Sequence, residues 1–279
     1  MLGVIGGTGL YQMEALREVR KMAVETPFGK PSAEITLGTY EGNSIAFLPR
    51  HGIHHEFLPS EINYRANLWA LKSLGVKRVI SVSAVGSLQA EIGPGELAIP
   101  SQYMDWTRGY RKSTFFGEGV VGHISTAEPT CPHLSELVKK CAKEEKIPLH
   151  TGKTYVCVEG PRLGTRAESF LFRNNGCHLV GMTNVPEVFL AREAQLSYCT
   201  LAVATDYDCW MEDPNEHVSV DKVMALYMSS IEKVQTLLKR VFVAKVDEDE
   251  SSCRRSLQGA IVTREIPESK TEMIRVLKL

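Results

Sequence analysis

The sequence of 279 residues lacks the features that mark several protein classes. Its seven cysteines include no C-x-x-C pair, which argues against a zinc ribbon or a thioredoxin motif, so we expect buried thiols in a reducing cytosol. No apolar run approaches the roughly 20 residues that a membrane-spanning helix needs. A formal net charge of -1 gives no basic excess, which argues against an electrostatic binder of nucleic acid.

Targeting signals and repeats are also missing. The amino terminus has no basic region and no cleavage site before its glycine turn, so we expect no signal peptide and a cytoplasmic location. No internal repeat is found. The composition, 43% hydrophobic and 23% charged, is that of an ordinary soluble globular protein with room for one large domain or two small ones.

Apolar runs of strand composition alternate with helical stretches along most of the chain. The start, "MLGVIGGTGL", is typical of a strand that ends in a glycine turn. Strands are also predicted at 43–49, 77–86, 95–100, 154–161, 177–183 and 196–208, and helices at 60–75, 131–146 and 218–245, with Ser60 and Ser219 as candidate N-caps. This alternation predicts an α/β domain whose sheet is covered on both faces.

The last part of the chain has a different composition. We place the domain at residues 1–245 and a separate tail at 246–279. Residues 246–256 are charged and serine-rich, which predicts an exposed linker. The apolar residues in 273–279 predict that the tail docks on the domain or on a neighbouring subunit.

The opening glycines form a turn that suits an anion. A glycine turn between a strand and a helix aims backbone N–H groups at a negative charge. A dinucleotide site would need G-x-G-x-x-G and an acidic strand end about 20 residues later, whereas a Pro/Gly loop stands at 25–32. The turn alone therefore leaves a dinucleotide, a free phosphate and an empty turn as alternatives.

Three further strand ends carry residues that suit an anion. Arg50 and His51 follow one strand, Ser83 and Ala84 lie at the end of another, and Thr183 follows a third. A metal site built on the histidines near residue 51 is less favoured, because no carboxylate or cysteine accompanies them at ligand spacing. Ligands of open α/β sheets bind at the carboxyl ends of the strands, so we expect these turns to share one crevice.

A pair of carboxylates follows the most apolar predicted strand. Asp206 and Asp208 alternate along the chain, which predicts that they point to the same side. They suit the N–H donors of a purine edge, although a metal pair or solvated residues beside a turn remain alternatives. Each carboxylate raises the pKa of its neighbour, so one of them is a candidate general acid.

With these motifs in place, the sequence resembles the trimeric purine nucleoside phosphorylase family, most closely its members that act on 5'-methylthioadenosine. The resemblance covers nearly all of residues 2–240. It rests on the ordered segments "VIGGTGL", "TPFGKPS", "PRHG", "INYRANLWALKSLGV", "GSL", "AEPTCP", "EGPR", "RAESF", "GMTNVPEV" and "ATDYDCW". The resemblance implies a single α/β domain with a central twisted mixed β-sheet flanked by helices.

The resemblance also implies a role for individual residues. Those matching the family's phosphate site are Thr8, Arg50, His51, Ser83, Ala84 and Thr183. Those matching its nucleoside site are Met182 under the ribose, His55 and Pro59 near the sugar and its 5' end, Asp206 and Asp208 at the adenine edge with Thr205 before them, and Leu163 against the base, where the family usually has phenylalanine. His123 matches a residue that the neighbouring subunit of a homotrimer supplies.

Three positions bear on the substrate that the resemblance implies. Val220, with Val223 and Met224 one turn on, replaces a histidine that meets the 5'-hydroxyl in relatives acting on inosine and guanosine. An apolar wall suits a methylthio group instead. Asp206 replaces an asparagine that reads a 6-oxo group, and Gly164 replaces a glutamate. These choices favour a 6-aminopurine with an apolar 5' substituent.

The implied activity is that of a pentosyltransferase in purine and methionine salvage. It would split 5'-methylthioadenosine with orthophosphate into adenine and 5-methylthioribose 1-phosphate, with phosphate as co-substrate and without a metal or an organic cofactor. The alternative within the family is a purine nucleoside or 5'-methylthioinosine phosphorylase. The alternatives outside it are a nicotinamide-dependent oxidoreductase and a catalytically silent nucleoside-binding protein. No partner beyond nucleoside, phosphate and further copies of the chain is expected.

Overall fold

A mixed nine-stranded sheet organises the part of the chain that this computed structural model describes, namely residues 1–7, 10, 16–211, 220–245 and 252–279. Its strands are β1 (Leu2–Gly6), β2 (Arg17–Met22), β3 (Ile35–Tyr40), β4 (Asn43–Pro49), β5 (Arg78–Ser87), β6 (Leu97–Trp106), β7 (Leu149–Val158), β8 (Leu179–Gly181) and β9 (Ser197–Asp206). Their order is β2-β3-β4-β1-β5-β8-β7-β6-β9, and β5 pairs with β9 as well.

The extra pairing turns half of the sheet into a ring. β5 is parallel to β1 on one edge and to β9 on the other, while the short β8 meets the end of β5 in antiparallel register. β9, β6, β7 and β8 then lead back to β5. β5 is therefore shared by an open sheet and a closed one, and its buried centre lies in the middle of the molecule.

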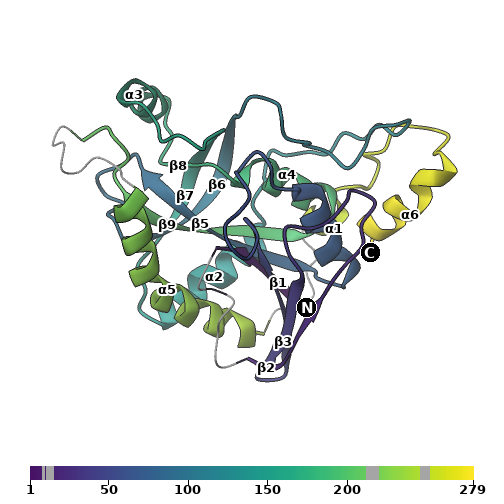
Figure 1. Cartoon of the computed structure of the whole chain (residues 1–279), viewed down its shortest axis with the longest axis horizontal. Coiled ribbons are helices and arrows are strands. Elements are labelled where there is room, and N and C mark those ends of the chain that lie inside the picture. The colour runs from purple at the N-terminus through teal and green to yellow at the C-terminus, as the bar shows by residue number, and fades with distance from the viewer. Residues whose placement is uncertain (8–9, 11–15, 212–219, 246–251) are drawn as a thin grey trace.

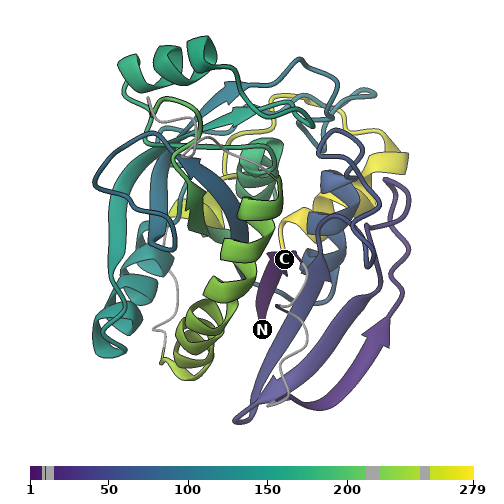
Figure 2. The ribbon, with the colours of Figure 1, turned by 60° about the vertical axis from the view of Figure 1, so that its left-hand side comes forward.

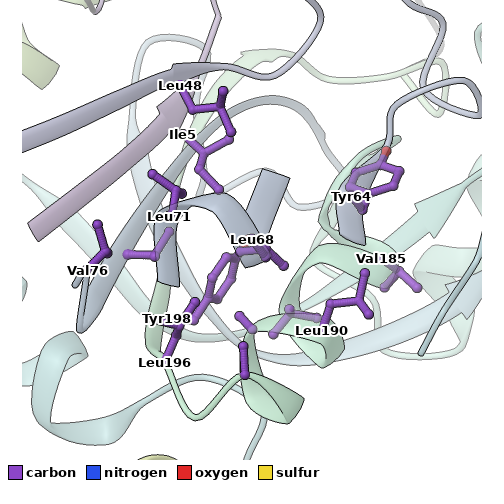
Figure 3. Packing of buried hydrophobic residues seen from close by; sticks show 14 of the residues in the cluster. Ile5, Leu48, Tyr64, Leu68, Leu71, Val76, Val185, Leu190, Leu196 and Tyr198 are labelled. Carbon is purple, nitrogen blue, oxygen red and sulfur yellow. The ribbon is translucent and has the colours of Figure 1, made fainter. Parts of the chain in front are cut away.

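Helices cover both faces of this sheet, as predicted. They are α1 (Tyr64–Ser73), α2 (Pro132–Glu144), α3 (Arg166–Asn174), α4 (Asn184–Glu193), α5 (Val220–Val243) and α6 (Glu268–Leu277), with a 3₁₀ turn η2 at Ser252–Arg255. One face packs on α1, α4 and α6 and the other on α2 and α5, each with its own apolar cluster (Figures 1 and 2). Figure 3 shows Leu71 of α1 beside Ile5 and Leu48 of the sheet, with Leu68 next to it and Leu190 nearer Val185.

Local signals explain where some helices begin. α1 starts at Asn63, whose side chain accepts the Ala66 N–H at 3.1 Å, so the predicted cap at Ser60 is wrong. Asparagine caps a helix about as well as serine does, and here it also satisfies a donor inside the turn. α5 begins at Val220, and its predicted cap Ser219 lies outside the described residues.

The C-terminal segment packs on the domain of its own chain. α6 buries Met273, Ile274 and Leu277, and these side chains belong to the cluster that contains α1. Figure 1 shows the segment beside α1, at the opposite end of the molecule from α3. The division of the chain at residue 245 remains a prediction.

None of the helices in the described residues is long and apolar enough to cross a membrane.

Candidate active site

A cavity of about 390 Å³ opens where the strands of the sheet end. Gly7 follows β1, Arg50 follows β4, Met182 follows β8, and Asp206 ends β9. The carboxyl half of β5 forms its floor from Val82 to Gly86. The predicted crevice at the carboxyl edge of the sheet is therefore present.

The structure brings almost all of the predicted site residues together in this cavity. Its lining includes Arg50, His51, His55, Pro59, Ser83, Ala84, Leu163, Met182, Thr183, Thr205, Asp206, Asp208, Val220, Val223 and Met224. Thr8 lies outside the described residues. His123 does not line the cavity: it is exposed on the loop between β6 and α2.

Arg50 forms the most buried charge of the site, and Glu187 of α4 neutralises it. The Arg50 Nε and Nη2 groups donate to the two Glu187 carboxylate oxygens at 2.8 and 3.1 Å. Nη2 also donates to Ser81 Oγ, and Nη1 donates to the Val82 carbonyl. Burial alone would lower the Arg50 pKa, but the Glu187 charge more than offsets it and raises the pKa above its usual value.

This contact corrects the interpretation of Arg50 made from the sequence. The planar guanidinium of Arg50 was expected to face an anion, but its Nε and Nη2 groups bind the Glu187 carboxylate instead. Of the five N–H donors of a guanidinium, these contacts leave one, on Nη1, for a ligand. Arg50 therefore offers an anion a single hydrogen bond.

His51 is held in one tautomer by the backbone. Its Nδ1 lies 2.9 Å from the Phe57 carbonyl, which can only accept, so Nδ1 carries the proton. The His55 ring stacks on it with centroids 4.2 Å apart. Burial lowers the pKa of His51 to about 4, so the ring is neutral at pH 7 and its Nε2 is an acceptor.

Two hydroxyl groups lie beside these residues. Ser83 Oγ and Thr183 Oγ1 are 3.4 Å apart, at the middle of β5 and at the start of α4. Ser83 and Ala84 were expected at a strand end, but β5 continues to Ser87 because it pairs with β9 beyond them. At these residues β9 pairs with only one edge of β5, because the pairing with β1 ends at Ser81 and the pairing with β8 begins at Gly86. Ser83 offers its side-chain hydroxyl to a ligand.

The two carboxylates lie at the other end of the cavity. Asp206 Oδ1 accepts the Asp208 N–H at 2.7 Å and Oδ2 accepts the Thr205 hydroxyl at 2.8 Å. Asp206 and Asp208 both face the cavity, but not because side chains alternate along a strand, as was expected. Asp208 lies beyond the end of β9 and has a φ of 54°. A Cβ on Gly86 would lie 3.1 Å from Asp206 Oδ1, so the glycine leaves room for the carboxylate.

Burial sets the acidity of this pair. It raises the pKa of Asp206 to about 6, with the charge of Asp208 as a smaller contribution. Burial also raises the pKa of Asp208. Desolvation, and not the mutual repulsion expected from the sequence, is thus the main cause of the raised Asp206 pKa.

The remaining wall of the cavity is apolar and partly open. Val220 and Met224 of α5 are 65% and 45% exposed although they line the cavity, and Leu58 is 43% exposed. Pro59 beside them is buried. Apolar side chains at the rim of a cavity suit a ligand with an apolar end.

No set of three or more His, Cys, Asp or Glu side chains in the described ranges is arranged to hold a metal ion. Within those ranges, the histidines near residue 51 are therefore not joined by a third such side chain in a metal site. That the protein works without a metal or an organic cofactor remains a prediction.

Comparison with known proteins decides the family. The family model described as the phosphorylase superfamily matches residues 1–242. The chain belongs to this superfamily.

Phosphorylase-superfamily relatives resemble the chain over most of its length. The S-methyl-5'-thioadenosine phosphorylase of Geobacter sulfurreducens is 48% identical over 264 residues, which is 94% of this chain and 92% of the relative. The enzyme of the same name from Thermococcus kodakarensis is 47% identical over 261 residues, 94% of this chain and 99% of the relative.

Two solved structures of the superfamily share the fold. A methylthioadenosine phosphorylase from an antarctic soil metagenomic library superposes with a TM-score of 0.92 at 42% identity, over 99% of this chain and 98% of that one. The methylthioadenosine phosphorylase from Schistosoma mansoni, solved in complex with adenine, gives 0.83 at 38% identity, over 86% and 90%.

One residue that orients this site, Glu187, was missed in the sequence. Glu187 lies in the quoted segment "GMTNVPEV", but no role was assigned to it. No local pattern pointed to it, because its partner Arg50 lies 137 residues away in the sequence.

Proposed function

We propose that the protein is an S-methyl-5'-thioadenosine phosphorylase, a pentosyltransferase that splits 5'-methylthioadenosine with phosphate into adenine and 5-methylthioribose 1-phosphate. The observation that carries the proposal is one cavity with three chemically different parts. Hydroxyl and basic groups lie at one end, two buried carboxylates lie at the other, and an apolar wall on α5 lies between them and solvent. The names of the relatives agree with this assignment.

Phosphate occupies the basic end in this proposal. Ser83 and Thr183 donate their hydroxyl hydrogens, and Arg50 donates its remaining Nη1 hydrogen. The neutral His51 Nε2 accepts the hydrogen of a monohydrogen phosphate dianion. Thr8, at the opening glycine turn, is proposed as a further contact.

Adenine occupies the carboxylate end. The bond between N9 and C1' breaks with its electron pair moving to the purine, and N7 takes a proton, for which Asp206 is the donor. Asp208 accepts a hydrogen bond from the 6-amino group, and Leu163 packs on the base. The phosphate stabilises the cationic sugar and then bonds to C1'.

The sugar and its 5' group lie along the remaining walls. Met182 lies under the ribose, and His55 and Pro59 lie near its 5' side. Val220, Val223 and Met224 enclose the methylthio group. In the homotrimer that we propose for the cytoplasmic protein, His123 of the neighbouring subunit closes the open side.

A substrate panel tests this proposal. Rates are measured with methylthioadenosine, methylthioinosine, adenosine and inosine, each with and without phosphate, after removal of metal ions by a chelator. We expect phosphate-dependent release of adenine from methylthioadenosine at the highest kcat/KM. A higher kcat/KM with methylthioinosine or inosine would contradict the adenine assignment, and release without phosphate would contradict phosphorolysis.

A further inference from the structure

The C-terminal segment, residues 252–279, is bound to the loop that carries His123. The Val262 N–H donates to the Val121 carbonyl at 3.0 Å, and the His123 N–H donates to the Ala260 carbonyl at 2.9 Å. Figures 1 and 2 both show the yellow segment running beside the loop between β6 and α2. The backbone of His123 is thus held directly by a part of the chain that lies outside the match to the family model.

Side chains add two further ties between the segment and the loop. The Val121 N–H donates to Thr263 Oγ1 at 2.8 Å, so the Val121 backbone is held on both sides. Lys270 of α6 forms an ion pair with Glu118 at the tip of the loop. On the loop, these contacts lie at His123 itself and at residues before it in the sequence.

The segment is itself fixed to the body of the domain. Met273, Ile274 and Leu277 of α6 are buried in the cluster that contains α1. The Leu257 N–H donates to Gln195 Oε1 at 3.3 Å, beside the end of α4. The segment can therefore hold the loop in a fixed position relative to the rest of the domain.

The side of the paired backbone that carries His123 is exposed in the single chain. His123 is exposed, and the neighbouring apolar side chains of Val121 and Val262 are 49% and 58% exposed. The His123 side chain is therefore accessible to a second copy of the chain. The nucleoside cavity of the same chain does not include His123.

We infer that the C-terminal segment is a positioning element, which holds the 118–123 loop so that His123 reaches the nucleoside bound by the neighbouring subunit. The inference rests on the proposed function, because it needs the nucleoside site to be shared between subunits. It assigns a role in substrate binding to the tail after residue 245. His123 contacts the substrate, and the tail acts only through His123.

The test removes one hydrogen bond without removing buried side chains. Val262→Pro deletes the N–H that binds Val121 while the exposed side chain loses little contact. Val262→Ala is the matched control, because it shortens the same side chain and keeps the N–H. Thr263→Val deletes the acceptor for the Val121 N–H with almost no change in shape.

The readouts are the KM for methylthioadenosine, the KM for phosphate and the oligomeric state by light scattering. We expect Val262→Pro and Thr263→Val each to raise the nucleoside KM about two- to tenfold, the range that one net hydrogen bond spans. The phosphate KM, the oligomeric state and the kinetics of Val262→Ala stay as in the wild type. Should Val262→Pro not fold, Thr263→Val carries the test.

A second background separates positioning from general destabilisation. His123→Ala raises the nucleoside KM, and adding Val262→Pro or Thr263→Val to it has no further effect, because the tail acts through His123. Additive effects, or equal changes in both KM values, would overturn the inference. So would a His123→Ala variant with an unchanged nucleoside KM. In each case the wild-type rate with methylthioadenosine tests the proposed function independently.

Discussion

Arg50 and Glu187 lie 137 residues apart in the sequence and meet in a two-point contact beside the cavity, with 2% of Arg50 and 1% of Glu187 exposed. Glu187 Oε1 also accepts hydrogen bonds from Ser81 Oγ at 2.6 Å and from the Tyr198 hydroxyl at 2.8 Å. The pair therefore joins β4, β5, α4 and β9 at one point. A buried pair of this kind is costly to break, since removing one partner leaves the other charge buried without it.

Glu187→Gln tests the stability of this contact. We expect it to lower the free energy of unfolding by about 3–5 kcal/mol, the usual cost of leaving one charge of a buried pair uncompensated. Urea unfolding followed by circular dichroism measures the change. The control is Glu136→Gln, which breaks the exposed pair with Lys139 and costs less than about 1 kcal/mol. Equal costs at the two sites would contradict the role given to Glu187.

Asp206→Asn separates catalysis from stability. We expect kcat with methylthioadenosine to fall about 10²–10⁴-fold, because asparagine keeps the shape but cannot donate the proton. The phosphate KM stays unchanged, since the carboxylate lies at the opposite end of the cavity. A variant with full activity would exclude Asp206 as the acid.

The same variant has an opposite effect on stability that depends on pH. The folded pKa of about 6 lies above the ordinary 3.8, so the stability linked to the retained proton is fully present below pH 3.8 and lost as pH rises through 6. We expect Asp206→Asn to raise Tm at pH 8, where the wild type buries a charge, and to change Tm little near pH 4. Thermal unfolding at both values measures this, and an equal change at both would contradict the burial of the charge.

The ring of His51 reports on the anion. Its pKa of about 4 is set by burial, so a bound phosphate dianion is expected to raise it by favouring the charged form. Nitrogen-15 NMR titration of the histidines with and without phosphate measures the shift. His178, whose pKa burial also lowers but which lies outside the cavity lining, should not respond to phosphate. A phosphate-independent His51 pKa would place the anion elsewhere.

The apolar wall on α5 predicts the preference for the 5' group. Val220→His introduces a donor at the rim of the cavity, so we expect the ratio of kcat/KM for methylthioadenosine over adenosine to fall about tenfold. Val220→Leu keeps the wall apolar and should leave the ratio within about twofold of the wild type. A ratio that Val220→His does not change would mean that the 5' end lies elsewhere.

The elements that the sequence predicted well are those with one buried face or a continuous apolar core. β4 was predicted at residues 43–49, as observed, and α2 and α5 within two residues at each end. The missed strand β2 is exposed along almost its whole length and four of its six residues are charged, so it has no hydrophobic pattern. α4 was missed for the opposite reason, because burial on nearly all sides hides the helical period.

Some missed features did have a signal. Thr165 and Glu168 form a complete capping box at the start of α3, and their spacing is readable in the sequence. The contact between Glu187 and Arg50 had no signal in the sequence, because no local pattern relates residues so far apart. Residue types therefore predicted the anion-suited turns and the carboxylate pair, and the resemblance supplied the other cavity residues, whereas the partners that orient them required the fold.

The shared strand β5 also sets the distance between the two ends of the cavity. Ser83, beside the Thr183 hydroxyl, and Gly86, beside the carboxylates, are three residues apart on one extended strand, a span of about 10 Å. Because hydrogen bonds to neighbouring strands fix that span, side-chain changes alter what each end binds but not the distance between the ends. The backbone of β5 therefore sets how long an accepted ligand can be, whereas the side chains at each end determine which chemical groups it must carry.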